Sequence, residues 1–229
     1  MDSDNLVNNI NNISATIKKN ITNFSFQINN SYDSEIKSIL EKSFVIYAYG
    51  YLEGLIKKIS KDYLNFVFQY CENNSDAIMI TPLYYLYKFK EFKCKNTNKY
   101  FKTILNGLEI LNINNDNNNY TVKANNNLKY DVLVMILHLL QFDLKNYETF
   151  KYSFIKDDNS EEEKELNLQN CLNDFVDDRN KIAHGDYDYI QGTFKLKNPW
   201  EIYKVMVISI LDNFTKEVIN IISEKSFLR

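Results

Sequence analysis

Apolar side chains recur at intervals of three and four residues along most of the chain, which is the spacing of amphipathic helices. Residues 6–28 carry this pattern and predict a first helix. The pattern continues from Ser34 to about Cys71 and predicts a second, long helix, with an N-cap at Ser31 or Asp33 in the loop before it. The chain is therefore expected to begin with two consecutive helices.

Further helices are predicted in the second half of the chain. Residues 129–142 are apolar almost all round and predict a buried helix, in which we interpret His138 as a core residue. Residues 143–152 predict another short helix.

Two start signals predict the last helices. Ser160 and Glu163 match a capping box, so a helix is predicted from this point to His184. Asn198, which precedes a proline, predicts the start of a final helix that ends near Ser226.

Only 5 glycines and 2 prolines interrupt 229 residues, which favours long helices. The predicted fold class is all-α, a helical bundle. We expect residues 1–30 to form an N-terminal helical extension and residues 31–229 to form the bundle domain.

Composition excludes some functions. A net charge of −3 argues against a protein that coats nucleic acid through its overall charge. Lys88, Lys90 and Lys93 lie among aromatic residues and are the best local candidates for RNA contact; the alternative is a helix with its aromatic residues in the core and its lysines in solvent.

Nothing in the sequence predicts a metal, a cofactor or a membrane span. The three cysteines lack the paired spacing of a zinc site. The N-terminus carries acids where a signal peptide carries bases, so we expect a soluble, cytoplasmic protein with no membrane partner.

Arginine and histidine are rare, and they coincide at one place. Of 27 basic residues only Arg179 and Arg229 are arginine, and His184 is one of two histidines. Arginine binds phosphate through a planar fork, and histidine exchanges protons near neutral pH. Together they could break a phosphodiester bond without metal. The alternative is structural: His184 at a helix end that Gly185 terminates, and Arg179 paired with a neighbouring aspartate.

The spacing within this pair restricts how it could act. At 100° per residue, Arg179 and His184 point about 140° apart on one helix, whereas Asn180 and His184 share a face. Either the last turn unwinds at Gly185, or the two groups meet their counterparts across a symmetric dimer.

Three segments resemble the HEPN superfamily, in particular bacterial members tied to phage defence and toxin systems. The segment Arg179–Gly185 resembles its signature of an arginine, four to six spacers and a histidine. Ser43–Lys57 resembles an early helix that reads aromatic, x, x, apolar, Glu, Gly. The approach to the motif, from Ala124–Leu128 through Leu172–Val176, follows the same branch, so the resemblance runs from about residue 40 to the end.

The resemblance implies an all-helical homodimer that cleaves RNA without metal by attack of the 2′-hydroxyl. Arg179 and His184 would be catalytic, with Asn180 on a phosphate oxygen or positioning His184. Glu53 would orient Arg179 or the RNA, or instead pair with Lys57.

Further implications concern the surroundings of the site and its biological setting. Asp178 is a supporting residue and Lys181 a further RNA contact. The implied role is that of a toxin or effector, with a separate antitoxin or sensor protein as partner. The alternative is a non-catalytic HEPN module that binds a nucleotide or a protein.

Overall fold

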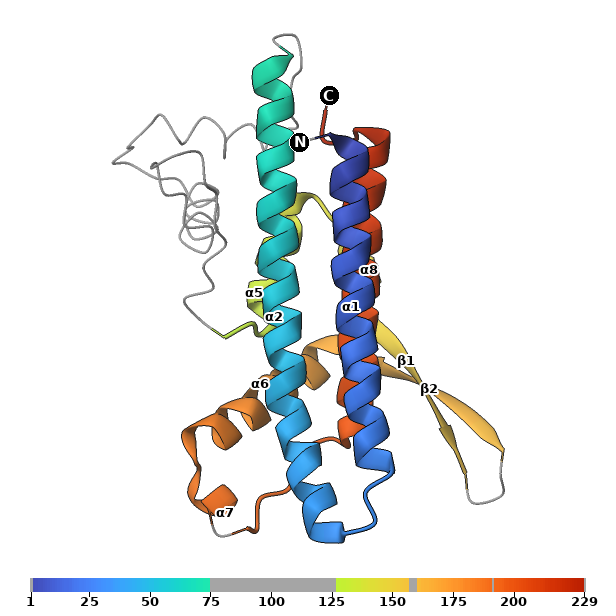
Figure 1. Cartoon of the computed structure of the whole chain (residues 1–229), viewed down its shortest axis with the longest axis vertical. Coiled ribbons are helices and arrows are strands. Elements are labelled where there is room, and N and C mark those ends of the chain that lie inside the picture. The colour runs from blue at the N-terminus through green and yellow to red at the C-terminus, as the bar shows by residue number, and fades with distance from the viewer. Residues whose placement is uncertain (1, 75–126, 157–159, 191, 229) are drawn as a thin grey trace. The chain divides into compact units, whose positions relative to one another are not determined.

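The computed structural model describes residues 2–74, 127–156, 160–190 and 192–228. These residues are mostly helical, and the elements in chain order are α1 (Ser3–Asn29), α2 (Ser34–Asn73), α5 (Tyr130–Leu140), the 3-10 turn η1 (Leu144–Tyr147), β1 (Thr149–Ile155), β2 (Glu161–Asn167), α6 (Leu168–His184), α7 (Tyr187–Ile190) and α8 (Trp200–Glu224). The predicted all-α fold class is confirmed, with one two-stranded hairpin added to the helices in the described ranges (Figure 1).

The described helices follow the predicted pattern closely in the first half of the chain. The carboxylate Oδ1 of Asp33 accepts hydrogen bonds from the backbone N–H groups of Glu35, at 2.8 Å, and Ile36, at 3.0 Å, so Asp33 is the N-cap of α2.

None of the described helices combines the length and apolar character needed to cross a membrane.

The chain forms two compact units, and three long helices contribute to both. The first unit comprises Met1–Ile13, Leu55–Leu144 and Phe214–Arg229, and the second comprises Ser14–Gly54 and Lys145–Asn213. The boundary between an extension of residues 1–30 and a domain of residues 31–229 stays a prediction.

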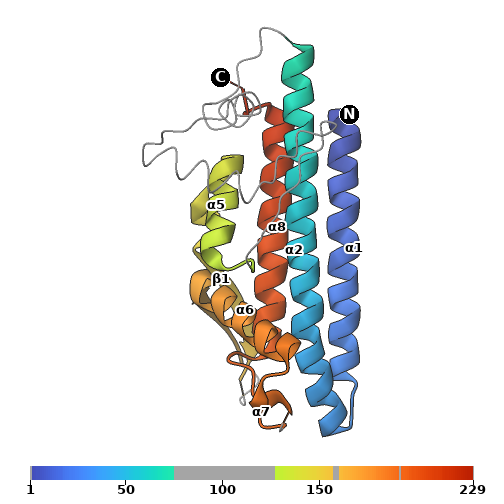
Figure 2. The same ribbon diagram turned by 90° about the vertical axis from the view of Figure 1, so that its left-hand side faces the viewer.

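In the first unit, α5 and the segment after it pack on the C-terminal parts of α2 and α8 through aromatic rings (Figure 2). The ring centroid of Phe142 lies 6.5 Å from that of Tyr63 and 5.1 Å from that of Phe214. Phe66 and the fully buried Phe227 extend this core, with centroids 5.9 Å apart.

The expectation that His138 belongs to this core is wrong. Its neighbours Leu137 and Leu139 are buried, but His138 itself is exposed on α5. An almost uniformly apolar sequence does not indicate which narrow face of a helix remains in water.

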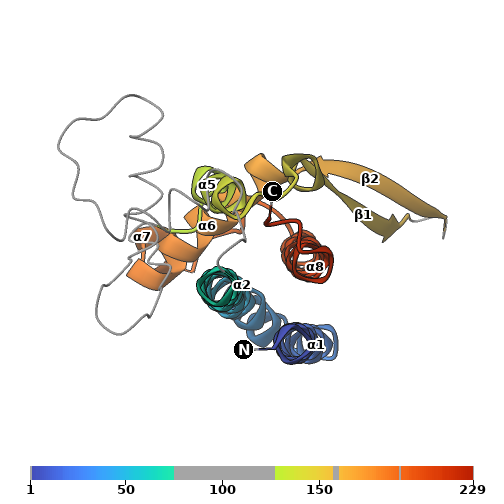
Figure 3. The same cartoon turned by 90° about the horizontal axis from the view of Figure 1, so that it is seen from above.

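In the second unit, aromatic residues connect α2, α6 and α8. Phe175 on α6 lies between Tyr49 on α2 and Tyr203 on α8, with centroid distances of 6.1 and 5.0 Å. Phe44 on α2 contacts Trp200 at the start of α8, at 5.4 Å. The end-on view in Figure 3 shows α6 beside these parts of α2 and α8. This packing fixes the helix that carries the candidate motif.

The prediction of a helix over residues 143–152 is wrong, because only η1 is helical there and β1 follows it. The prediction that a helix begins at Ser160 is also wrong, because residues 161–167 form β2, which pairs antiparallel with β1. Opposite charges face each other across the hairpin: Lys151 pairs with Glu163 at 2.7 Å and Lys156 with Glu162 at 2.6 Å. Cross-strand pairs and the backbone ladder therefore outweigh the local capping-box signal.

Helix α6 begins later than predicted, at Leu168. The side-chain oxygen of Asn167 accepts a hydrogen bond from the backbone N–H of Asn170, at 2.9 Å, and caps the helix. The helix then runs to His184, the C-terminus that the sequence predicts.

Candidate functional site

Helix α6 ends in a glycine cap directly after His184. Gly185 is left-handed, with φ of 65° and ψ of 51°. Its N–H donates to the carbonyl of Ile182, and the N–H of Asp186 donates to the carbonyl of Lys181, at 3.3 and 2.9 Å, which is the Schellman arrangement. The last turn therefore stays helical through His184, so unwinding at Gly185 does not bring Arg179 and His184 together.

The guanidinium group of Arg179 lies on an aromatic ring. Its Cζ is 4.5 Å from the ring centroid of Tyr49, a buried residue of α2. Its Nη1 donates a hydrogen bond of 2.9 Å to the Oδ1 of Asn180. Both Arg179 and Asn180 are half-buried. Cation–π contact and hydrogen bonding hold the fork in one orientation before any ligand arrives.

His184 lies in a different environment. It is exposed to solvent at the C-terminal end of α6. Helix geometry directs it about 140° away from Arg179. The chain thus presents one half-buried cation and one exposed proton carrier at neighbouring positions of the same helix end.

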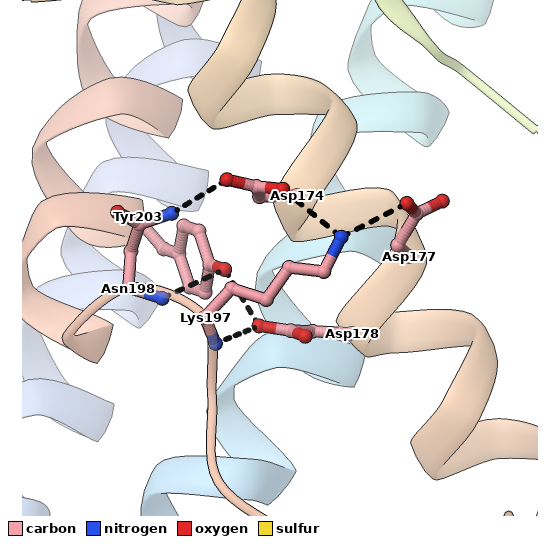
Figure 4. A network of polar contacts seen from close by, with 6 residues as sticks. All are labelled: Asp174, Asp177, Asp178, Lys197, Asn198 and Tyr203. Atoms are coloured by element: carbon pink, nitrogen blue, oxygen red, sulfur yellow. Dashed lines mark hydrogen bonds and ion pairs between the residues drawn. The ribbon is translucent and has the colours of Figure 1, made fainter.

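A polar network attaches α6 to the start of α8 (Figure 4). The buried carboxylate of Asp178 accepts, through Oδ2, a 2.6 Å hydrogen bond from the hydroxyl of Tyr203 and a 2.8 Å bond from the backbone N–H of Lys197. Asp178 therefore anchors α6, the helix that also carries Arg179, to the start of α8; its supporting role stays a prediction.

Two further aspartates of α6 complete the network. The ammonium group of Lys197 pairs with Asp174 at 3.0 Å and with Asp177 at 3.1 Å (Figure 4). The side chain of Asn198 donates a 3.2 Å hydrogen bond to the Oδ2 of Asp174. Sequence reasoning missed Lys197 as a partner, although aspartates at positions i, i+3 and i+4 of one helix indicate that a cation or several donors face them.

The family comparison matches residues 4–226 to the RiboL-PSP-HEPN model. The chain belongs to the RiboL-PSP-HEPN family. The predicted membership of the HEPN superfamily is thereby confirmed, over a longer stretch than the three resembling segments. A search of curated proteins and a search of solved structures each found no match. Membership points to a nuclease or a nucleotide-binding module.

In this HEPN protein, the remaining predicted site residues lie at different distances from the motif. Glu53 is half-buried on α2, one turn beyond Tyr49, and so lies on the flank of α2 that carries Arg179. Lys181 is exposed, with its ammonium group 6.0 Å from the ring centroid of Phe194. The expected RNA contacts Lys88, Lys90 and Lys93 lie outside the described residues.

Burial shifts the pKa values of two groups in the polar network, Asp178 and Tyr203. It raises the pKa of the Asp178 carboxyl group; the hydrogen bonds from Tyr203 and Lys197 lower this pKa, but by less than burial raises it. Burial and the adjacent Asp178 raise the pKa of the Tyr203 hydroxyl, which therefore stays protonated and donates. Within the described ranges, no three His, Cys, Asp or Glu residues are grouped as a metal site would require.

Proposed function

We propose that the protein is a metal-independent endoribonuclease that cleaves RNA by attack of the ribose 2′-hydroxyl. We further propose that it acts as a toxin or effector in bacterial phage defence or in a toxin–antitoxin pair. The observation that carries the proposal is the state of Arg179, whose guanidinium group is held on Tyr49 and by Asn180 at the end of the helix that presents His184. A cation fixed in advance is most effective where negative charge develops in a transition state.

The chemistry needs a base, an acid and a cation. A base removes the proton of the 2′-hydroxyl, the 2′-oxygen forms a bond to phosphorus, and the bond from phosphorus to the 5′-oxygen breaks as that oxygen takes up a proton. His184 serves as base or acid, since an imidazole exchanges protons near neutral pH. Arg179 stabilises the additional negative charge on the phosphoryl oxygens. The products are a 2′,3′-cyclic phosphate and a 5′-hydroxyl.

Two copies of the chain would complete this site. Because α6 remains helical through His184, Arg179 and His184 of one copy point about 140° apart. A two-fold dimer supplies two histidines and two arginines around one phosphate, so that one His184 can act as base and the other as acid. The homodimer and the RNA substrate are both parts of the proposal.

Cleavage of a pool of cellular RNA by the purified protein in EDTA tests the function. We expect fragments with 2′,3′-cyclic phosphate and 5′-hydroxyl ends, because the proposed chemistry uses only the side chains and the RNA's own 2′-hydroxyl. Cleavage that disappears in EDTA and returns with a divalent metal would contradict the scheme. A folded dimer that binds nucleotide without cutting any RNA would favour the non-catalytic HEPN module.

Replacement of Arg179 by lysine tests whether the shape of the cation matters as well as its charge. Lysine keeps a positive charge but loses the planar fork that lies on Tyr49 and donates to Asn180. We expect cleavage to slow by roughly 10- to 100-fold, with the loss in kcat. Single-turnover rates measure this, and circular dichroism checks that α6 is intact. An unchanged rate would show that Arg179 serves only the fold.

A further inference from the structure

One face of α2 in the second unit is exposed, uncharged and continuous. Its members lie within an arc of roughly 80° around the helix axis. They are Ile36, Ile39, Ser43, Ile46, Gly50 and Gly54, all of them exposed. The three isoleucines have exposed fractions of 52%, 56% and 37% in the order of the chain. We name this set the α2 stripe.

The glycine end of the α2 stripe is open. A Cβ atom built on Gly50 or Gly54 would have no neighbour within 4 Å, so no close helix contact inside the described chain requires glycine at these positions. Isoleucine side chains exposed to water leave apolar surface unburied. Glycines inside a helix lower its stability, because glycine has a low helix propensity. Both features are explained if another helix covers the stripe.

We propose that a second copy of this chain docks on the α2 stripe, with the two α2 helices antiparallel and the two-fold axis between positions 43 and 46. The proposal rests on the composite site proposed above, and it names the surface that forms that site. The order of residue sizes along the stripe favours this occupant. A two-fold contact pairs residue i with residue j and residue j with residue i.

In the antiparallel register, large residues of one copy meet small residues of the other. Ile36 faces Gly54 and Ile39 faces Gly50 of the second copy, while Ser43 faces Ile46 at the centre. Each glycine thus contacts an isoleucine of the other copy, and the two-fold symmetry repeats these pairs on both halves of the contact. A contact core without charged residues is typical of stable interfaces.

The proposed axis lies beside the end of the HEPN motif. Arg179 contacts Tyr49, and Tyr189 of α7 lies near Lys42, whose ammonium group is 5.8 Å from the Tyr189 ring centroid. His184 lies between Arg179 and Tyr189 in the sequence, so both contacts hold the segment that carries it on one flank of α2. The axis between positions 43 and 46 falls between Lys42 and Tyr49.

The symmetry also places both motifs on one side of the helix pair. A two-fold axis perpendicular to two antiparallel helices carries a given flank of one helix to the same side of the other. Figure 1 shows the C-terminal end of α6 and α7 projecting to one side of α2. In the dimer, both motif ends would therefore lie on the same face of the helix pair, where a single RNA strand can reach them.

Cysteine cross-linking tests the register. In a background of Cys71→Ser and Cys94→Ser, with the buried Cys171 retained, Ile39→Cys is placed in one tagged copy and Gly50→Cys in a copy with a different tag. We expect the mixture to form a cross-linked heterodimer on oxidation or with a short bifunctional thiol reagent. Each variant alone should give no cross-link, because its two equivalent cysteines lie about 16 Å apart along the helices.

The variant Gly50→Leu tests the surface itself. The open space at Gly50 admits a side chain in the monomer, so the helix should fold while the dimer dissociates, as measured by light scattering. Lys19→Leu, at an exposed position of α1, is the matched control and should remain dimeric. A Gly50→Leu variant that stays dimeric, or cross-links within each single variant but none in the mixture, would overturn the proposal.

The same experiments separate this proposal from the proposed function. Cross-linking in the expected register without any RNA cleavage would support the α2 stripe and count against the ribonuclease. Cleavage by a wild-type dimer that gives no cross-link in the mixture would support the ribonuclease and reject the α2 stripe.

Discussion

RNA cleavage should fall by roughly 10²- to 10⁴-fold in a His184→Ala variant, the usual contribution of a positioned general acid or base. His184 is the last residue of α6 and is exposed, so its replacement removes no core packing. Initial rates on a defined RNA, measured at equal concentrations of folded protein, give the comparison.

The other histidine provides a matched control for this prediction. His138 is also exposed on a helix, but it lies on α5 in the first unit. His138→Ala should therefore cleave at the wild-type rate. Added imidazole should restore part of the activity of His184→Ala if proton transfer is what the variant lacks. Equal rates for wild type and His184→Ala would exclude His184 from the chemistry.

Replacement of Asp178 by alanine should destabilise the fold by roughly 2–4 kcal/mol. The change leaves two buried donors without an acceptor, the hydroxyl of Tyr203 and the backbone N–H of Lys197. Removal of a buried carboxylate with a raised pKa offsets part of this cost. For a chain of this length, the loss corresponds to a decrease in Tm of about 5–15 °C, measurable by calorimetry.

Asp177→Ala is the matched control for Asp178→Ala. Asp177 lies one position earlier on α6 and contacts Lys197 through a side chain that is 38% exposed. Exposed ion pairs contribute little, and Lys197 retains Asp174, so we expect a loss below about 1 kcal/mol. Equal losses of stability in the two variants would show that the two buried donors at Asp178 are not the main cause of the destabilisation.

Asp178→Asn separates the charge from the hydrogen bonds. The amide oxygen can still accept from Tyr203 and Lys197, while the ionisable group is gone. Because the folded pKa of Asp178 is raised, the folded state binds more protons than the unfolded state between the two pKa values, and wild-type stability falls as pH rises through this window. Relative to wild type, Asp178→Asn should gain stability from about pH 4 up to the folded pKa and stay level above it. A stability difference between Asp178→Asn and wild type that stays constant across this pH range would contradict the raised pKa of Asp178.

Periodicity in the sequence was sufficient to predict the helices that form the core. The spacing of apolar residues predicts α1, α2, α5 and α8, because a helix that buries one face must repeat apolar residues every three or four positions. It failed at the hairpin, where acidic residues precede α6 and a capping-box pattern occurs by coincidence. The alternation of Phe150, Tyr152 and Phe154 with polar residues was the available strand signal.

The candidate site shows a similar division between local and long-range information. The rarity of arginine and the spacing to His184 identified the motif from local sequence. The contact between Arg179 and Tyr49 could not be predicted in this way, because 130 positions separate the two residues and only tertiary packing brings them together. The same holds for the hydrogen bond between Asp178 and Tyr203.

Adjacent positions on α6 have opposite surroundings, and this affects how genetic screens of the protein should be interpreted. Asp178 faces the buried network, whereas Arg179 faces Tyr49 and the motif end. Under the proposed toxin function, a selection that scores only loss of toxicity would recover substitutions at either position as equivalent hits. Parallel measurement of cellular abundance would distinguish them, since variants at position 178 should be depleted from the cell and variants at position 179 should accumulate as intact but inactive protein.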